Sequence, residues 1–115
     1  MKRGTIILTP FPFTDLTQNK VRPALIVSSD FRKDSDIIIA FISSVIDSNL
    51  DTDSTIIVRK DDFDFPGTGL KVSSVIRVDK LATIDRDIVL GGLGFANGNL
   101  MRRVNEKLKT VLDLK

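Results

Sequence analysis

The sequence predicts a mainly β domain that ends in one helix. Short runs of β-branched and aliphatic residues, such as Asp36–Ser44, alternate with polar breaks through most of the chain, which is typical of short strands. Only residues 97–114 place apolar side chains at helical spacing. About five or six strands and one helix in a small chain indicate a strongly curved sheet or small barrel that the helix covers.

The length and composition predict a single soluble domain spanning residues 1–115. The chain has 115 residues, of which 42% are hydrophobic and 28% charged, as in ordinary globular proteins. No apolar run approaches the roughly 18 residues of a membrane span. The first apolar run, Ile6–Leu8, is shorter than the about 7–15 residues of a signal peptide. We therefore expect a cytoplasmic protein with no membrane contact.

The chain contains no cysteine and no histidine. This excludes disulfides and a thiolate nucleophile, and it removes the usual general base and the commonest zinc ligand. We therefore expect neither a metal nor a cofactor.

The net charge of +2 is too small to indicate nucleic-acid binding by itself. However, nine of the acidic residues lie between Asp30 and Asp64, a segment that has only four basic residues. Such a two-signed surface fits one anionic ligand, although solvation alone explains most asymmetry of this size.

The N-terminal segment predicts a strand over Thr5–Thr9 followed by a loop. Pro10 and Pro12 lack the N–H that a central strand needs, so they place the end of this strand at a sheet edge or in a loop. The polar loop Thr14–Lys20 then leads directly to Arg22. It is either a ligand-binding lid or a simple hairpin connection.

The stretch from Lys20 to Ser44 predicts an antiparallel hairpin. Two apolar runs, each expected to reach the core with both faces, flank the short polar break Asp30–Ser35. In a hairpin the start of one strand lies beside the end of the next, so Arg22 should neighbour Ser43 and Ser44 at one rim of the sheet. An ordinary surface ion pair of Arg22 with an aspartate is the alternative.

The second half of the chain predicts further strands, over residues 55–59, 71–78 and 81–84. Between the first two, residues 61–69 read as a turn with two anchoring side chains, Phe63 and Phe65. Residues 88–95 read as a glycine-punctuated turn, because the glycines do not follow the strand-to-helix pattern of a phosphate loop. The final helix begins near Asn97 or Asn99, either of which suits an N-cap.

Several segments together resemble the MazF/PemK toxin family. The opening Gly4–Leu16 contains Phe11-Pro12-Phe13 and is followed by Arg22-Pro23 at the start of a strand. The likeness continues through Ile39–Ser44, resumes over Gly69–Ile84 and ends on the expected helix. It covers nearly the whole chain, and the Arg-Pro strand opening after the Phe-Pro-Phe loop is its most specific part.

The resemblance implies an SH3-like small barrel of the CcdB/MazF type that forms a homodimer. It implies a ribosome-independent, metal-independent and sequence-specific endoribonuclease that cleaves single-stranded RNA at short sequences and leaves a 2′,3′-cyclic phosphate and a 5′-hydroxyl. It also implies a small cognate antitoxin as partner, with DNA contacted only through the antitoxin complex. The catalytic arginine and threonine of the family fall on Arg22 and Ser43 of this chain.

The chemistry of these two groups suits RNA cleavage. RNA supplies its own nucleophile, the 2′-hydroxyl, so the protein has to stabilise a charged phosphorane. Arg22 presents a planar fork of donors to phosphate oxygens, and Ser43 can donate a hydrogen bond or orient the 2′-hydroxyl. We further expect the preceding loop to form part of the RNA site and to select bases. The expected RNA-binding residues are Phe13, Thr14, Asp15, Gln18, Asn19, Lys20 and Ser44.

Two departures from the family pattern keep other functions open. Gly4-Thr5 stands where the family usually has Gly-Asp, and Ser43 replaces the threonine while keeping its hydroxyl. A degenerate toxin that survives as an antitoxin-binding or regulatory module is therefore one alternative. A second is a CcdB-like gyrase poison, which shares the barrel. That branch carries a tryptophan near its C-terminus, whereas this chain has none.

Overall fold

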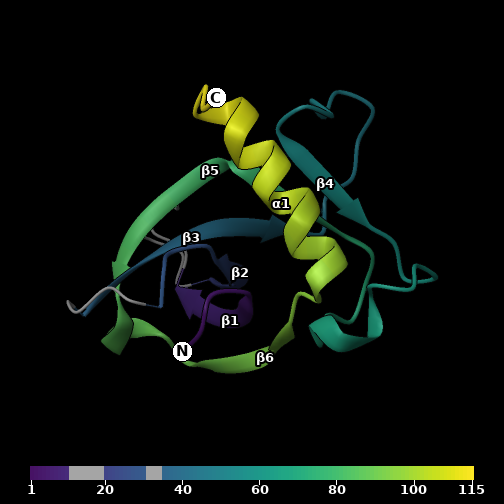
Figure 1. Ribbon diagram of the computed structural model, residues 1–115. Coiled ribbons are helices and arrows are strands. Elements are labelled where there is room, and N and C mark those ends of the chain that lie inside the picture. Colours follow the sequence, from purple (N-terminus) through teal and green to yellow (C-terminus); the bar gives the residue numbers. More distant parts are fainter. Residues whose placement is uncertain (11–19, 31–34) are drawn as a thin grey trace.

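The computed structural model describes residues 1–10, 20–30 and 35–115 of the chain. These residues form six strands, two short 3-10 helices and one α-helix (Figure 1). The elements are β1 (Thr5–Pro10), β2 (Val21–Ile26), β3 (Asp36–Ser43), β4 (Thr55–Val58), η1 (Pro66–Thr68), β5 (Ser74–Asp85), η2 (Arg86–Ile88), β6 (Gly91–Phe95) and α1 (Gly98–Val111).

The strands form one antiparallel sheet in the order β4-β5-β3-β2-β1-β6. Figure 1 shows this sheet curling into a half-barrel, with α1 lying across it. The predicted fold class, mainly β with a C-terminal helix, is confirmed. The predicted hairpin is also confirmed, because β2 and β3 pair antiparallel, with Ala24 opposite Phe41.

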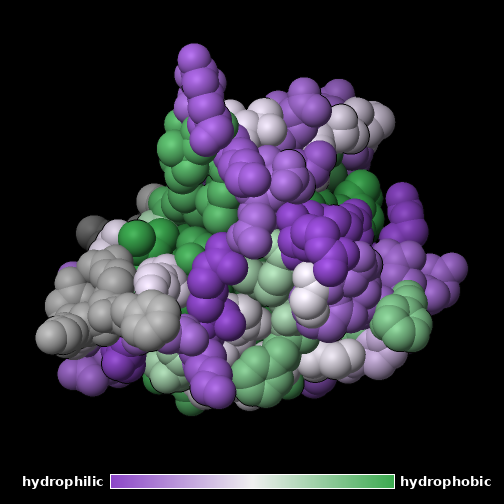
Figure 2. Space-filling view, viewed as in Figure 1, coloured by the Kyte–Doolittle hydropathy of each residue, from purple (hydrophilic) through white to green (hydrophobic). Residues whose placement is uncertain are grey.

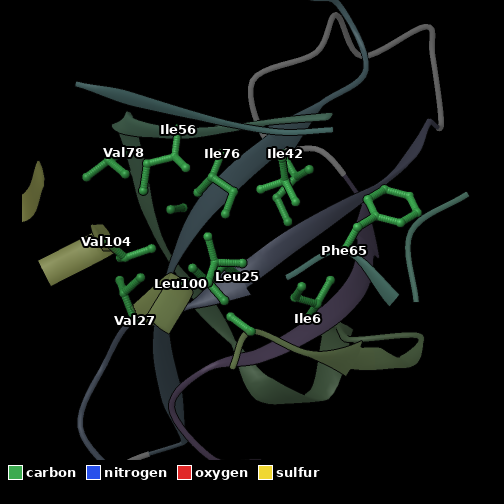
Figure 3. Packing of buried hydrophobic residues seen from close by; sticks show 13 residues of the cluster. Ile6, Leu25, Val27, Ile42, Ile56, Phe65, Ile76, Val78, Leu100 and Val104 are labelled. Atoms are coloured by element: carbon green, nitrogen blue, oxygen red, sulfur yellow. The ribbon is translucent and has the colours of Figure 1, made fainter. Parts of the chain in front are cut away.

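Apolar side chains pack on both faces of the sheet. On one face, Leu100 and Val104 of α1 meet Leu25, Ile76 and other strand residues in the larger cluster (Figure 3). The second cluster lies on the opposite face. Both β2 and β3 contribute to each cluster, as expected for strands that bury both faces. The second cluster consists of Ile7, Ala24, Ile26, Ile37, Ile39, Phe41 and Ile84.

Strand β5 corrects the prediction of two separate strands over 71–78 and 81–84. The register against β3 runs from Asp85 to Leu81, which faces Ala40, and then jumps to Arg77, which faces Phe41. Residues 78–80 therefore form an irregularity in one continuous strand. Asp79 and Lys80, which separate the two predicted strands, therefore belong to a bulge within one strand, and bulges bend a sheet sharply.

Strand β6 corrects the prediction of a glycine-punctuated turn over 88–95. Its glycines weaken the strand signal, but they allow close backbone approach. A Cβ atom on Gly94 would lie 2.4 Å from the carbonyl oxygen of Gly67 in η1. The segment is thus an edge strand on β1 whose glycine accommodates the backbone of η1.

The 61–69 turn contains one anchoring phenylalanine, not two. Phe65 is buried in the larger cluster, whereas the Phe63 side chain is 92% exposed. Asp64 supplies a second attachment, because its carboxylate accepts hydrogen bonds from the side-chain amides of Asn97 (2.7 Å) and Asn99 (3.0 Å). Phe63 failed as an anchor because Asp64 and Phe65 fix the turn so that their neighbour faces solvent.

Helix α1 is amphipathic, as the sequence predicts. Asn97 is its N-cap, with Oδ1 accepting from the Leu100 N–H at 2.8 Å. Leu100 and Val104 are fully buried, and Figure 2 shows hydrophilic atoms along the outward side of the helix. Within the described residues, no helix combines the length and apolar character that crossing a membrane requires.

Candidate active site

The facing ends of β2 and β3 bring Arg22 and Ser43 together. The register that pairs Ala24 with Phe41, when continued by two residues, places Arg22 opposite Ser43. Both side chains line one pocket of about 160 Å³, which we call the catalytic pocket after the role that the sequence predicts for Arg22 and Ser43. Its other lining residues are Phe41, Ile42, Val45, Arg77 and Lys80.

Arg22 lies at the rim between the two faces of the sheet. It opens β2, is half-buried rather than fully exposed, and its Nε atom is buried. The side chain lines both the catalytic pocket and a second cavity. Burial of Nε restricts the orientations of the guanidinium, whose planar fork of donors suits an anion bound in either cavity.

Ser43 presents its hydroxyl at the end of β3. Its Oγ accepts a hydrogen bond from the N–H of Val45 at 3.0 Å, which fixes the chain as it leaves the strand. Because the oxygen is the acceptor in this contact, the hydroxyl proton is available to donate. Ser43 is half-buried, so this donor is positioned but accessible.

Arg77 is a member of the catalytic pocket that the sequence interpretation did not single out. It lies opposite Phe41 on β5, and Asp79 holds its guanidinium in a two-point contact, Nε to Oδ1 at 3.0 Å and Nη2 to Oδ2 at 2.8 Å. This hydrogen bond lowers the pKa of Asp79 and raises that of Arg77. The available signal was an Arg and an Asp two residues apart on one strand, where alternate side chains share a face.

The remaining predicted site residues are less closely gathered. Ser44 lines the second cavity, of about 350 Å³, rather than the catalytic pocket. Lys20 is exposed immediately before β2. The other five lie outside the described residues, so their roles remain predictions: Phe13, Thr14, Asp15, Gln18 and Asn19.

The charges around the catalytic pocket favour an anionic ligand. Arg22, Arg77 and Lys80 line it, and the neighbouring carboxylate of Asp79 compensates one of these cations. Across the described ranges, no three His, Cys, Asp or Glu side chains gather as metal ligands. The arrangement suits a phosphate diester, whose oxygens match arginine forks and a hydroxyl donor.

Solved structures share this fold at low sequence identity. An endoribonuclease in complex with its cognate antitoxin, from a mycobacterial species, has a TM-score of 0.78 at 19% identity, with 100% of this chain and 97% of that chain covered. The Mycobacterium tuberculosis toxin MazF-mt6 gives 0.74 at 18%, covering 96% and 98%. A MazE-MazF structure from Deinococcus radiodurans gives 0.71 at 17%, covering 100% and 98%. These likenesses establish the fold.

A comparison with protein-family models identifies the family of this chain. No protein with a curated description matched the chain significantly in sequence. The model that describes PemK-like, MazF-like toxins of type II toxin–antitoxin systems matches residues 2–112, which include every strand and the whole of α1. This chain therefore belongs to the PemK-like, MazF-like toxin family of type II toxin–antitoxin systems.

Proposed function

We propose that this chain is a metal-independent endoribonuclease that cleaves single-stranded RNA. The observation that carries the proposal is the catalytic pocket, in which Arg22 and Ser43 line one cavity together with Arg77 and Lys80. The structurally similar mycobacterial protein is itself an endoribonuclease, which agrees with this assignment. The chain lacks histidine and cysteine, the commonest zinc ligands, and among the described residues no carboxylates gather into a group that could hold a metal ion.

The reaction uses the substrate's own nucleophile. The 2′-oxygen attacks the adjacent phosphorus, the bond from phosphorus to the 5′-oxygen breaks, and a 2′,3′-cyclic phosphate forms. The 2′-hydroxyl loses its proton and the leaving 5′-oxygen gains one, so the products are the cyclic phosphate and a 5′-hydroxyl. No external reactant is consumed in this step.

The protein contributes mainly by stabilising charge. Arg22 is the catalytic residue that binds the phosphate oxygens as negative charge builds on them, and Ser43 donates to the phosphate or orients the 2′-hydroxyl. A guanidinium is always protonated near neutral pH, so we assign Arg22 no proton transfer. Each preorganised donor of this kind is worth about 10²–10³ in rate.

Arg77 is proposed as a second cation for the same phosphate. It lines the pocket with Arg22, and the two-point contact with Asp79 holds its guanidinium plane on the pocket wall. Asp79 then acts as a positioning residue, because it works through Arg77.

We also propose a homodimer and a small antitoxin as partner. The similar mycobacterial endoribonuclease is in complex with its cognate antitoxin, and the Deinococcus radiodurans structure pairs MazE with MazF. An antitoxin tail with acidic and apolar residues would suit the cationic pocket and fold as it binds.

Cleavage of a defined RNA by the purified chain in EDTA tests the proposal. We expect products with 2′,3′-cyclic phosphate ends, no cleavage of the same sequence with 2′-deoxyribose, and loss of activity in Arg22→Ala. Arg102→Ala, which removes an exposed arginine of α1, is the matched control and should cleave normally. An inactive wild-type protein would favour the degenerate binding module, and cleavage of the 2′-deoxy strand would exclude the mechanism.

A further inference from the structure

We propose that the second cavity beside Arg22 binds one nucleobase of the RNA and selects a keto base, meaning one with a carbonyl oxygen at C6 or C4 where adenine and cytosine carry an amino group: guanine or uracil. This cavity, called the base slot below, is lined on its apolar sides by Leu8, Pro23, Ile42, Leu70, Val72 and Leu93. Its polar groups come from Arg22, Ser44, Lys71 and Ser74. The inference rests on the endoribonuclease function proposed above.

The base slot lies next to the catalytic pocket, where a base attached to the bound phosphate would be expected. Arg22 and Ile42 line both the catalytic pocket and the base slot, so the two cavities adjoin at these two residues. A nucleotide carries its phosphate and its base on one ribose, so a phosphate held at Arg22 places the attached base nearby. The base slot has about 350 Å³ and the catalytic pocket about 160 Å³, so the larger cavity suits the bulkier group.

The walls of the base slot suit the two faces of a base. Aliphatic side chains line it, including Leu70 and Leu93, both half-buried. Such walls give close dispersion contacts on the flat faces of a heterocycle. The polar edge of the base would then point toward the few polar groups of the slot, which is the usual design of a small-molecule site.

The polar lining favours acceptors on the base. Lys71 carries only donors, and no carboxylate belongs to the described lining of the slot. The hydroxyl of Ser74 is buried and already donates to the carbonyl oxygen of Val72 at 2.8 Å. A lysine ammonium matches the O6 and N7 acceptors of guanine or the keto O4 of uracil, whereas adenine and cytosine present an amino group at that edge.

The wall that carries Lys71 is preceded by a segment fixed by close contacts and hydrogen bonds. Gly69 has a positive φ of 73°, and a Cβ atom there would lie 2.1 Å from the Leu93 carbonyl oxygen. The buried hydroxyl of Thr68 donates to Phe65 at 2.6 Å and accepts from the N–H of Leu70 at 3.2 Å. A preformed wall avoids the cost of ordering a loop on binding, which favours selection by the slot over general attraction.

The test uses short strands with a single ribonucleotide in otherwise 2′-deoxy sequence, so that only one linkage is cleavable. The bases on each side of that linkage are varied among the four types. We expect the wild-type chain to cleave strands with a keto base at one flanking position at least tenfold faster. Lys71→Ala should reduce that preference about tenfold, since one good base contact carries about 1–3 kcal/mol of discrimination.

Two further variants separate selection from general effects. Lys60→Ala removes another exposed lysine, one that does not line the slot, and should keep the preference. Val72→Trp fills the slot from an exposed position and should abolish it. An equal slowing of all strands by Lys71→Ala would overturn the inference. Unchanged base preference in Val72→Trp would also overturn it. The slot would then be assigned to binding an apolar side chain of a protein partner.

Failure of the proposed function has a different signature. If the wild-type chain cleaves none of the strands, the same set with a 2′-O-methyl group at the cleavable position is used for binding. A keto preference in binding that disappears in Lys71→Ala would support the slot without the nuclease. Binding with no base preference would overturn it.

Discussion

Arg77 and Asp79 hold each other in a two-point ion pair on the wall of the catalytic pocket, with donor–acceptor distances of 3.0 and 2.8 Å. The side chains are 25% and 32% exposed, so water screens the pair only in part. The bulge over residues 78–80 of β5 brings Arg77 opposite Phe41, near the end of β3. Asp79 lies within this bulge. The pair thus links an irregularity of the sheet to the chemistry of the site.

Asp79→Asn tests this pair through the pH dependence of stability. The pKa of Asp79 is lowered in the folded state by the hydrogen bond from Arg77, so the pair stabilises the fold above the unfolded pKa of about 4 and loses this effect as the pH falls through the folded pKa. We expect the variant to lower the free energy of unfolding by up to about 1 kcal/mol at pH 7. Urea unfolding at several pH values measures this.

The difference between wild type and Asp79→Asn should disappear in strong acid and shrink in high salt. Asp53→Asn, at an exposed position of the 47–54 linker, is the control and should show little change. A stability difference that persists undiminished at pH 2 would mean that the variant acts through packing.

Arg22→Lys tests whether cleavage requires the planar fork of hydrogen-bond donors of arginine or only its positive charge. Lysine keeps the positive charge but cannot contact two phosphate oxygens in parallel, so we expect RNA cleavage to fall by about 10²-fold or more. Urea unfolding checks that the fold survives, since Arg22 is half-buried. Cleavage within a fewfold of wild type would reduce the role of Arg22 to general attraction of RNA.

The two serines at the end of β3 have different expected roles. Ser43 lines the catalytic pocket, and Ser44 lines the base slot on the other face. We expect Ser43→Ala to slow the cleavage of every substrate oligonucleotide by about 10- to 1,000-fold, because one hydrogen-bond donor is lost. Ser43→Thr keeps the hydroxyl and should retain activity. Single-turnover rates on the four base series measure both effects.

Ser44→Ala should leave the fastest rate nearly unchanged and alter only base choice. If Ser44→Ala proves the more damaging change on every strand, the assignment of these two residues to their pockets is exchanged. The pair of variants therefore tests strand orientation and chemistry together.

The local pattern of the sequence predicted most of the fold where one strong signal dominated. The hairpin of β2 and β3 follows from two apolar runs around a polar break, and α1 follows from the helical spacing of Leu100 and Val104. The same reasoning placed Arg22 beside Ser43, because antiparallel pairing fixes which strand ends meet.

The features that the sequence did not predict depend on tertiary contacts. Strand β6 pairs with β1 although glycine disfavours strands, and η1 approaches Gly94 closely. Strand β5 continues through residues 78–80 because both its parts pair with β3. The membership of Arg77 in the catalytic pocket depends on that bulge, and the two-residue spacing of Arg77 and Asp79 does not reveal the bulge by itself.

Gly94→Ala tests whether close backbone approach explains the glycine of β6. The new methyl group would lie 2.4 Å from the carbonyl oxygen of Gly67 and 2.6 Å from the carbonyl carbon of Thr68. Neither atom belongs to a flexible side chain, so η1 or β6 must move. Overpacking of this kind costs about 1–3 kcal/mol, and we expect urea unfolding to show a loss in that range.

Gly92→Ala is the matched control on the same strand. A Cβ atom there meets no other atom within 4 Å, and alanine loses less backbone entropy on folding than glycine, so stability should stay unchanged or rise by about 0.5–1 kcal/mol. Equal losses in the two variants would attribute both to the edge strand as a whole. A loss confined to Gly94→Ala would establish that this glycine is required by η1, whose end supports the Gly69–Val72 wall of the base slot.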